Sequence, residues 1–299
     1  MRRRSTLVAS ALTAGLLALA GCGSSSLDNS SGKQGSDVKA STDDAAAKLV
    51  PQAIKDKGTL TIGSDASYAP SEFLAADGKT IDGFDVDLFT AVGKTLGLKV
   101  KFTNAKFDSI ITGVQGGKFD VGVSSFTINA DRLKQVNMVS YFNAGTQWAS
   151  APGNPKNVDT DKPCGATVAV QKGTVQQEED LPAKQKACQT AGKPLKVLVY
   201  EGQDQATAAV ASGKADAMLA DSPVVAYAVQ QSKGKLEALG DIYDSAPYGY
   251  VVPQDQKPLA EAIVAALKSL QSNGDYEKAL KGWGVEDGAI SDFAVNPTP

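Results

Sequence analysis

Residues 117–125 read GKFDVGVSS, and residues 213–221 read GKADAMLAD, the same pattern 96 positions later. In each copy a glycine-lysine turn ends a helix, an apolar strand follows, and polar residues stand at the strand's carboxyl end. Because open α/β sheets bind ligands outside these carboxyl ends, the repeat predicts two similar lobes with Ser125 and Asp221 facing each other across a cleft. The alternative is that Gly-Lys-x-Asp is simply a common turn after any helix.

The sequence around the two copies alternates between strand-like and helical patterns, as expected of an α/β protein. Strands are predicted over 59–62, 98–102 and 121–123, and helices over 84–96 and 107–114. The length of 299 residues suits two domains. With 42% hydrophobic and 21% charged residues, the composition disfavours a mainly disordered chain or one with many membrane spans.

The chain contains no histidine. This excludes Ser-His and Cys-His nucleophile pairs, HExxH zinc helices and imidazole acid–base catalysis. The three cysteines include no CxxC pair and cannot form a structural zinc site without histidine. We therefore expect no metal site and no cofactor, and hydrolytic enzymes of the common kinds are disfavoured.

The N-terminus has the pattern of an export signal. Three arginines at positions 2–4 precede an apolar run over 7–20, which is too short for an ordinary membrane-spanning helix. Residues 19–22 (LAGC) resemble the lipobox of bacterial lipoproteins, which implies removal of residues 1–21 and attachment of a diacyl (palmitate-type) lipid to the sulfur of Cys22. The alternative is an ordinary signal peptide followed by a chance cysteine.

Removal of residues 1–21 takes the formal net charge from −3 to −6, because the segment carries three arginines and no acidic residue. A nucleic-acid-binding role therefore lacks its electrostatic footprint. Residues 22–48 are rich in small and polar residues. They are predicted to form a flexible tether with a reach of roughly 25–30 Å, so that structure begins near Leu49.

After lipidation, Cys164 and Cys188 are the remaining cysteines. An even pair in an exported domain is more often bridged than free. A bridge would close a loop of 23 intervening residues, and in the chain-entropy model it adds ~3 kcal/mol to the free energy of unfolding.

Five stretches resemble a known family: residues 58–70 (GTLTIGSDASYAP), 83–87 (GFDVD), 124–132 (SSFTINADR), 168–176 (VAVQKGTVQ) and 215–221 (ADAMLAD). In this order and spacing they resemble the family 3 solute-binding proteins, the amino-acid-binding proteins of bacterial ABC importers. The resemblance extends from about Gly58 to Trp283. It implies a two-lobed α/β fold of the type II periplasmic-binding-protein kind, with two hinge crossings, ligand-induced closure and no enzymatic activity.

By this resemblance the chain divides into a signal peptide (1–21), a lipidated cysteine with its tether (22–48), lobe 1 (49–147 and 248–299) and lobe 2 (148–247). A C-terminal helix would pack on lobe 1 through Leu259, Ile263, Leu267 and Leu270.

Two positions depart from the family pattern. Ala69-Pro70-Ser71 stands where the family usually has Pro-Pro-Phe after Tyr68, which removes an aromatic residue from the cleft mouth. Val175 replaces a residue that often carries a hydroxyl, so that a side-chain hydrogen bond is lost while main-chain donors remain.

A free amino acid carries a carboxylate and an ammonium, and a closed site has to satisfy both. Arg132 matches the family's carboxylate clamp, because a guanidinium binds a carboxylate bidentately, and it is the only arginine of the mature chain. Main-chain donors at Thr174 and Val175, in a turn that opens a helix, are expected to face the same anion. Ser125 and Thr127 offer hydroxyls and main-chain groups to it. The alternatives are a surface ion pair for the arginine and a helix N-cap for the threonine of the turn.

Asp221, in the other lobe, is the expected partner of the ammonium, so binding both charges requires closure. Tyr68 and Phe107 resemble the aromatic walls that enclose the aliphatic part of the ligand, although aromatic residues at such spacings are more often core residues.

Asp65 and Gln171 are expected to line the part of the cleft that receives the ligand's side chain, with Lys172 pointing away by strand alternation. A buried anion beside a neutral amide disfavours an acidic ligand, and a hydrophobic ligand would leave both polar groups without partners. This favours a polar or cationic amino acid, with glutamine, arginine, lysine and histidine as candidates. The alternative is that Asp65 binds backbone amides in its own turn.

Together these interpretations predict a lipid-anchored, extracytoplasmic solute-binding protein that delivers a polar or cationic amino acid to an ABC permease. The expected partners are the free amino acid, the permease and ATPase subunits, and the membrane through the lipid anchor alone, with no nucleic acid and a monomeric state. The nearest alternative is a binding protein for an opine or another small carboxylate. An enzyme such as a periplasmic dehydratase would use Asp65, Glu72 or Asp221 as acid or base, and the sensing half of a signalling system is disfavoured because no spanning helix or kinase follows.

Overall fold

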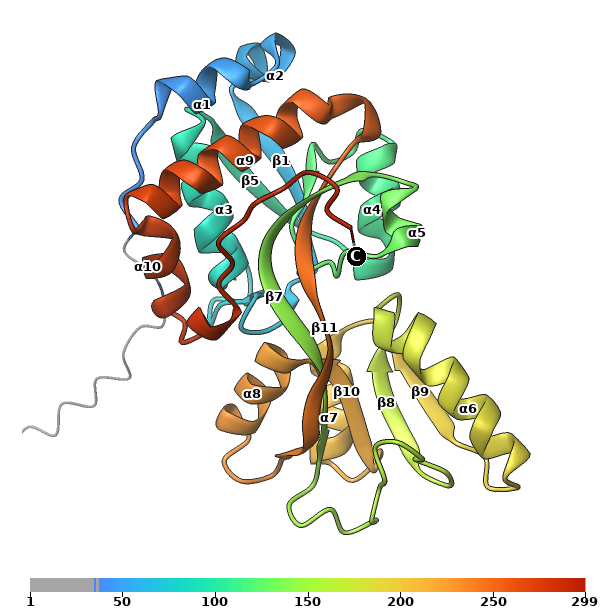
Figure 1. Ribbon diagram of the computed structural model, residues 1–299. Coiled ribbons are helices and arrows are strands. Elements are labelled where there is room, and N and C mark those ends of the chain that lie inside the picture. The colour runs from blue at the N-terminus through green and yellow to red at the C-terminus, as the bar shows by residue number, and fades with distance from the viewer. Residues whose placement is uncertain (1–34, 36–37, 299) are drawn as a thin grey trace, which may run out of the picture. The chain divides into compact units, whose positions relative to one another are not determined.

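The structure, a computed structural model, describes residue 35 and residues 38–298 (Figure 1). Over this part of the chain, strands and helices alternate as the sequence predicts. One mixed sheet has the order β5-β1-β6-β11-β7-β10-β8-β9. Its strands are β1 (Thr59–Ser64), β5 (Lys99–Asn104), β6 (Val121–Gly122), β7 (Asn137–Ser150), β8 (Thr167–Gln171), β9 (Lys196–Tyr200), β10 (Ala217–Asp221) and β11 (Glu237–Val252).

A small second sheet and the helices complete the fold. The small sheet contains β2 (Ser67–Tyr68), β3 (Glu72–Leu74) and β4 (Ile81–Asp82). The α-helices are α1 (Asp44–Leu49), α2 (Gln52–Lys57), α3 (Phe84–Thr95), α4 (Phe107–Gln115), α5 (Ala130–Leu133), α6 (Leu181–Thr190), α7 (Gln203–Ala211), α8 (Ser222–Gln231), α9 (Lys257–Ser272) and α10 (Asp275–Lys281). A π-helical segment, η1 (Gln176–Asp180), and two 3₁₀ helices, η2 (Gln254–Gln256) and η3 (Glu286–Gly288), are also present.

The two long strands β7 and β11 join two lobes. They pair antiparallel along most of their length, and Figure 1 shows both running from one lobe to the other. On one side of these strands β1 pairs parallel with β5 and β6, and on the other side β8 pairs parallel with β9 and β10. Tyr141 of β7 packs in the lobe 1 core, whereas Trp148 of the same strand packs in a lobe 2 core. These are the two hinge crossings that the family resemblance implies.

The repeated pattern of the sequence has the same structural role in both lobes. Asp120 follows α4 and accepts a hydrogen bond from Thr61 N at 2.6 Å, and Asp216 follows α7 and accepts one from Thr167 N at 2.7 Å. Each aspartate thus joins the strand that it precedes to the neighbouring parallel strand. The strands β6 and β10 that follow direct Ser125 and Asp221 toward the same cavity.

The C-terminal helix α9 packs on lobe 1, as predicted. It contacts α1, α3 and α10, and it buries its apolar face completely, including Leu259, Ile263, Leu267 and Leu270. Full burial of a leucine or isoleucine side chain stabilises a fold by roughly 1.5–3 kcal/mol, so this helix, at the far end of the sequence, is a main component of the lobe 1 core.

Ordered structure begins earlier than the sequence predicts. Helix α1 starts at Asp44, and the Asp43 side chain caps it by accepting from the main-chain N of Ala45 and Ala46. Val38 packs against the lobe 1 core even before this helix. The tether therefore ends before residue 48. The prediction from composition placed its end too late, because a short helix that buries few residues does not change the composition of the segment. The signal peptide and Cys22 lie outside the described residues, and no helix within the described part is long and apolar enough to cross a membrane.

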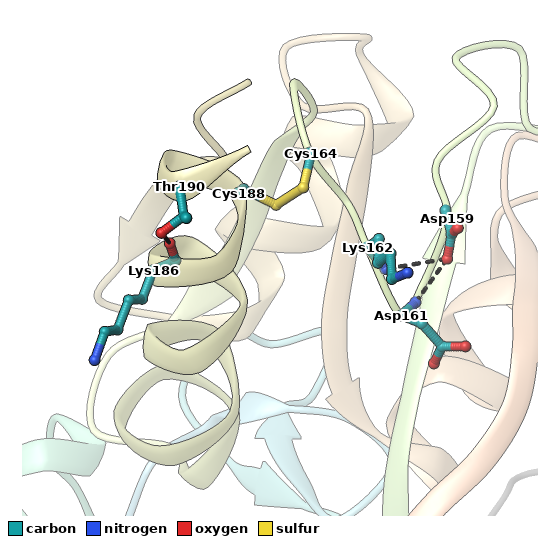
Figure 2. Close-up of a disulfide and its surroundings, with 7 residues drawn as sticks. All are labelled: Asp159, Asp161, Lys162, Cys164, Lys186, Cys188 and Thr190. Carbon is teal, nitrogen blue, oxygen red and sulfur yellow. Dashed lines mark hydrogen bonds between the residues drawn. A yellow bond between two sulfur atoms is a disulfide. The ribbon is translucent and has the colours of Figure 1, made fainter. Parts of the chain in front are cut away.

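Cys164 and Cys188 form the disulfide that the sequence analysis predicts (Figure 2). It joins the loop before β8 to helix α6, where Cys188 is fully buried. The segment between the two cysteines carries β8 and the turn at 172–176. The bridge therefore encloses one of the elements that the sequence assigns to ligand binding.

Candidate functional site

A small cavity between the lobes, called here the cleft cavity, has a volume of about 10 Å³, roughly the space of one water molecule. Its lining residues come from both lobes and are Tyr68, Phe107, Ser125, Thr127, Arg132, Thr174, Val175, Gln176 and Asp221. Eight of the ten residues that the sequence analysis assigns to ligand binding are in this set. The structure places Asp65 and Gln171 outside it and adds Gln176.

Arg132 is a buried cation that forms no ion pair with a carboxylate of the described residues. It lies in the short helix α5, which Asn129 caps by accepting from Arg132 N at 2.8 Å. The guanidinium donates to the main-chain oxygens of Thr127, at 2.7 Å, and of Gly173 in the other lobe, at 3.0 Å. Its Cζ lies 5.6 Å from the ring centroid of Phe107.

Arg132 is 6% exposed and takes part in no ion pair within residues 38–298. The surface ion pair that the sequence analysis kept as an alternative is therefore not what the structure shows. A guanidinium has five N–H donors. The Arg132 guanidinium, which donates to two main-chain oxygens, therefore still has N–H groups that can bind an anion.

Asp221 is the complementary anion, at the end of β10. Its Oδ2 accepts from the Tyr68 hydroxyl at 2.8 Å, and its Oδ1 accepts from Gln176 Nε2 at 2.7 Å. Burial raises the pKa of Asp221. No lysine or arginine of the described chain forms an ion pair with it. A carboxylate in this setting can accept a hydrogen bond from an ammonium that enters the cavity.

The turn after β8 supplies the lobe 2 wall opposite Arg132. Thr174 Oγ1 donates to Gln171 O at 2.8 Å and accepts from Gln177 N at 3.3 Å, so the helix-capping role proposed as an alternative is present. Thr174 and Val175 nonetheless line the cavity. The turn therefore caps the following helical segment and also lines the cavity.

Gln176 was missed in the sequence analysis. It is the first residue of η1, is buried, and holds Asp221 and Thr146 through its amide. Its position directly after the β8 turn, at the end of the family-like stretch 168–176, is the sequence feature that indicates a role in the site.

The aromatic residues and Ser125 are buried around the cavity. Phe107 stacks on Phe126 with ring centroids 4.5 Å apart, and Tyr68 packs with the lobe 2 core although it belongs to lobe 1. Ser125 has a left-handed main chain with φ 48°, and both its N and its Oγ donate to Asp85 Oδ2, at 3.0 and 3.2 Å. The two hydrogen bonds to Asp85 thus fix the position of Ser125 at the cavity wall.

Asp65 and Gln171 contact each other across the lobes instead of lining the cavity. Gln171 Nε2 donates to Asp65 Oδ2 at 3.1 Å. Asp65 also accepts from Ser67 N and Oγ and from Phe107 N, so the binding of amides in its own turn, kept as an alternative, is observed. Burial raises the pKa of Asp65. Lys172 points away from the cavity, as expected, and pairs with Asp108 at 2.8 Å.

The chain is similar to known proteins over most of its length. The model of the bacterial extracellular solute-binding proteins, family 3, matches residues 60–286. The arginine-binding protein ArgT of Corynebacterium glutamicum is 37% identical over 252 residues, which cover 84% of this chain and 82% of the relative.

Two solved structures are similar over most of the chain. An ancestral arginine-binding protein bound to arginine has a TM-score of 0.70 and 32% identity, and the match covers 76% of this chain and 98% of that one. The ancestral amino acid-binding protein AncCDT-1, a precursor of cyclohexadienyl dehydratase, has a TM-score of 0.68 and 32% identity, with 79% and 99% covered.

Proposed function

Because the chain belongs to the bacterial extracellular solute-binding proteins of family 3, we propose that it captures a polar or cationic L-amino acid between its lobes and delivers it to an ABC permease. The family and the named relatives bind amino acids rather than transform them. L-Arginine is the first candidate ligand, since ArgT and the ancestral protein of known structure are both named for arginine.

The observation that carries the proposal is the placement of Arg132 and Asp221. One buried cation and one buried anion line the same cavity, and neither forms an ion pair with a charged side chain in the described chain. An α-amino acid carries a carboxylate and an ammonium on the same carbon atom, which complements this pair. Because the two residues come from different lobes, both charges are satisfied only in the closed state, and a permease can distinguish this state from the open one.

The ligand's side chain is proposed to extend toward Asp65 and Gln171. Asp65 is buried and its Oδ2 accepts from Gln171 Nε2 and from Phe107 N. A guanidinium or ammonium that replaces the neutral amide donor would give this carboxylate a charge-assisted hydrogen bond, which is stronger than a neutral one. If the ligand's cationic group replaced the Gln171 amide as a donor, Asp65 would become part of the binding site.

A periplasmic dehydratase on the same fold is the less favoured function, although one structural neighbour is described as the precursor of such an enzyme. Of the three acid or base candidates in the sequence, Asp221 lines the cavity, and Asp65 and Glu72 do not. Asp221 already holds the Tyr68 hydroxyl and the Gln176 amide. These contacts favour a charge partner over a group that exchanges protons.

In the cell the protein is proposed to be extracytoplasmic and monomeric, held to the membrane by the lipid on Cys22, with residues 1–21 removed. Its lobes are proposed to span 49–147 with 248–299, and 148–247. The permease and its ATPase would accept the ligand from the closed form.

Isothermal calorimetry on the purified full chain tests the proposal with single L-amino acids, with an opine as a separate arm. We expect L-arginine, or another amino acid with a cationic or amide side chain, to bind. At a ligand concentration of 100 times its Kd, binding should raise the free energy of unfolding by ~2.7 kcal/mol. Binding of the opine alone would favour the small-carboxylate alternative. If glutamate or leucine outcompetes every amide and cationic amino acid on the wild type, the proposed class is wrong.

The Asp65→Asn variant tests the side-chain part separately. It should lose selectivity for cationic over neutral amino acids while it keeps binding to the shared headgroup. Unchanged selectivity would leave Asp65 as a turn-capping residue only.

A further inference from the structure

Two buried carboxyl groups, those of Glu72 and Asp85, lie behind the cleft cavity and do not line it. Glu72 begins strand β3, and Asp85 lies in the first turn of α3, within the quoted stretch 83–87. Both side chains are completely buried. Neither has a role in the proposed function so far.

Asp85 connects three parts of lobe 1 through one oxygen. Its Oδ2 accepts from Ser125 N at 3.0 Å, from Ser125 Oγ at 3.2 Å and from the Tyr141 hydroxyl at 2.7 Å. Ser125 lines the cavity, and Tyr141 belongs to the hinge strand β7. The left-handed φ of 48° at Ser125 is unusual for a residue with a side chain, so it needs such an external restraint.

Glu72 holds the neighbouring residue of the same loop. Its Oε1 accepts from Ser124 Oγ at 2.8 Å, and that hydroxyl in turn accepts from Asp65 N at 3.0 Å. Gly83, the N-cap of α3, packs tightly against the residue before Glu72: its φ is 138°, and a Cβ there would lie 2.1 Å from Ser71 O.

The second oxygens of the pair, Glu72 Oε2 and Asp85 Oδ1, are buried and accept from no donor among the described residues. Asp85 N donates at 3.0 Å to the main-chain oxygen of Ser71, the residue before Glu72, and the two carboxyl groups bind the adjacent residues Ser124 and Ser125. Glu72 and Asp85 are therefore neighbours in a buried site, where two carboxylates of like charge repel each other. We expect one of the two groups to be protonated for this reason.

Among the described residues, no lysine or arginine pairs with Glu72 or Asp85 to neutralise their charge. The titratable groups that act on the pair from the packed elements are Asp65, Tyr68, Tyr141, Tyr248 and Tyr250, all of which are acids. Burial and the charge of Asp85 raise the pKa of Glu72 well above its usual value, and burial raises the pKa of Asp85 to about 6.

We propose that Glu72 and Asp85 share one proton at neutral pH and act as positioning residues that hold Ser125 in the conformation needed to bind the amino-acid headgroup. This inference rests on the proposed function of the cleft cavity. In it Glu72 is the protonated member and donates to Asp85, which stays ionised and accepts from Ser125 and Tyr141.

The shared proton predicts a ligand affinity that falls at both ends of the pH range. As the pH falls through about 6, the pKa of Asp85, this carboxyl gains a proton and its charge-assisted bonds to Ser125 weaken. As the pH rises through the pKa of Glu72, the pair becomes two adjacent anions that repel each other. The Glu72→Gln variant carries a permanent donor at nearly the same shape, so it should keep neutral-pH affinity and lose the alkaline decline.

The test measures L-arginine affinity by calorimetry against pH, for the full chain and for Glu72→Gln, Asp85→Asn and the exposed control Asp77→Asn. Asp85→Asn should weaken binding roughly tenfold, because a neutral acceptor replaces a charged one at Ser125. Wild type and Asp77→Asn should share one pH profile. The ligand's own ammonium titrates equally in all variants, so the difference between wild type and Glu72→Gln isolates the pair.

Infrared spectroscopy tests the proton without any ligand. Wild type should show a protonated carboxyl band at neutral pH that is absent from Glu72→Gln. A missing band in wild type, or identical pH profiles for wild type and Glu72→Gln, overturns the inference. If wild type binds no amino acid at all, the proposed function fails, and the infrared band still decides whether the proton is shared.

Discussion

The hydroxyl of Tyr68 donates to Asp221 Oδ2 at 2.8 Å, and this bond joins lobe 1 directly to lobe 2. The same hydroxyl accepts from Asp221 N at 3.2 Å. Tyr68 is therefore more than an aromatic wall, because its polar end lies at the anion proposed to bind the ligand's ammonium. Closure and ligand recognition are connected at this contact.

Removing only the hydroxyl of Tyr68 should weaken ligand binding. In Tyr68→Phe the ring stays as a wall, and the closed state loses a hydrogen bond to a charged group, worth roughly 1.5–3 kcal/mol, so affinity for L-arginine should fall about tenfold by calorimetry. Tyr68→Ala, which also removes the wall, should be more damaging. Equal effects of the two changes would mean that the ring contributes nothing to binding, and an unchanged affinity in Tyr68→Phe would mean that the hydroxyl contributes nothing.

The headgroup clamp is tested by Arg132→Lys and Asp221→Asn. The first keeps the charge and loses the bidentate fork, and the second removes the counter-charge for the ammonium. Each should weaken binding by at least ~2 kcal/mol, the lower end for truncation of a buried hydrogen-bonded charge pair. Asp131→Asn is the matched control, since Asp131 neighbours Arg132 in sequence but is largely exposed. Near-wild-type calorimetric affinity in both variants would refute the assignment.

The ion pairs at the rim of the cleft should matter much less. Lys172 pairs with Asp108 and Lys106 with Glu201, each at 2.8 Å and each between residues of opposite lobes. These side chains are partly or largely exposed, and exposed ion pairs are weak and screened by salt. Lys172→Gln, or a rise in ionic strength, should change affinity less than about fivefold.

Lys257→Gln, an exposed lysine outside the cleft, provides the control for this comparison. A Lys172→Gln effect as large as that of Arg132→Lys would show that the rim, rather than the buried pair, controls closure.

The disulfide should stabilise the fold without taking part in binding. The double variant Cys164→Ser with Cys188→Ser should unfold at a lower denaturant concentration, because its free energy of unfolding falls by ~3 kcal/mol in the chain-entropy model. Its affinity for L-arginine in native buffer should stay within about threefold of the wild-type value. A large loss of affinity in a still folded variant would contradict this, because it would show that the bridge holds the β8 turn in its binding conformation.

Cys22→Ser should release the protein from the membrane fraction of cells. The reason is that the lipid on this cysteine is the proposed attachment, and no helix in the described residues is suited to span a membrane. Immunoblots of separated membrane and soluble fractions measure the change. Mature Cys22→Ser protein that stays with the membranes would show that another attachment exists.

Much of the fold and of the site is determined by local sequence patterns. The repeat of residues 117–125 at 213–221 requires only that a helix, a turn and a strand recur, and these depend on neighbours in the chain. It predicts Ser125 and Asp221 in one cavity, where the structure places both. Arg132 is recognisable because it is the one arginine after residue 21, and its burial agrees with that expectation.

The tertiary structure alone decided which groups meet across the lobes. The Asp65–Gln171 bond, the anchoring of Arg132 by Gly173 O, and the contact of Tyr68 with Asp221 all join residues more than 40 positions apart. The hydrophobic periodicity of the sequence does not predict such contacts, because they depend on how far the lobes close about the hinge strands. The carboxyl pair of Glu72 and Asp85 is hidden for the same reason: a sequence shows two acids, and only packing that excludes water and cations forces them to hold a proton.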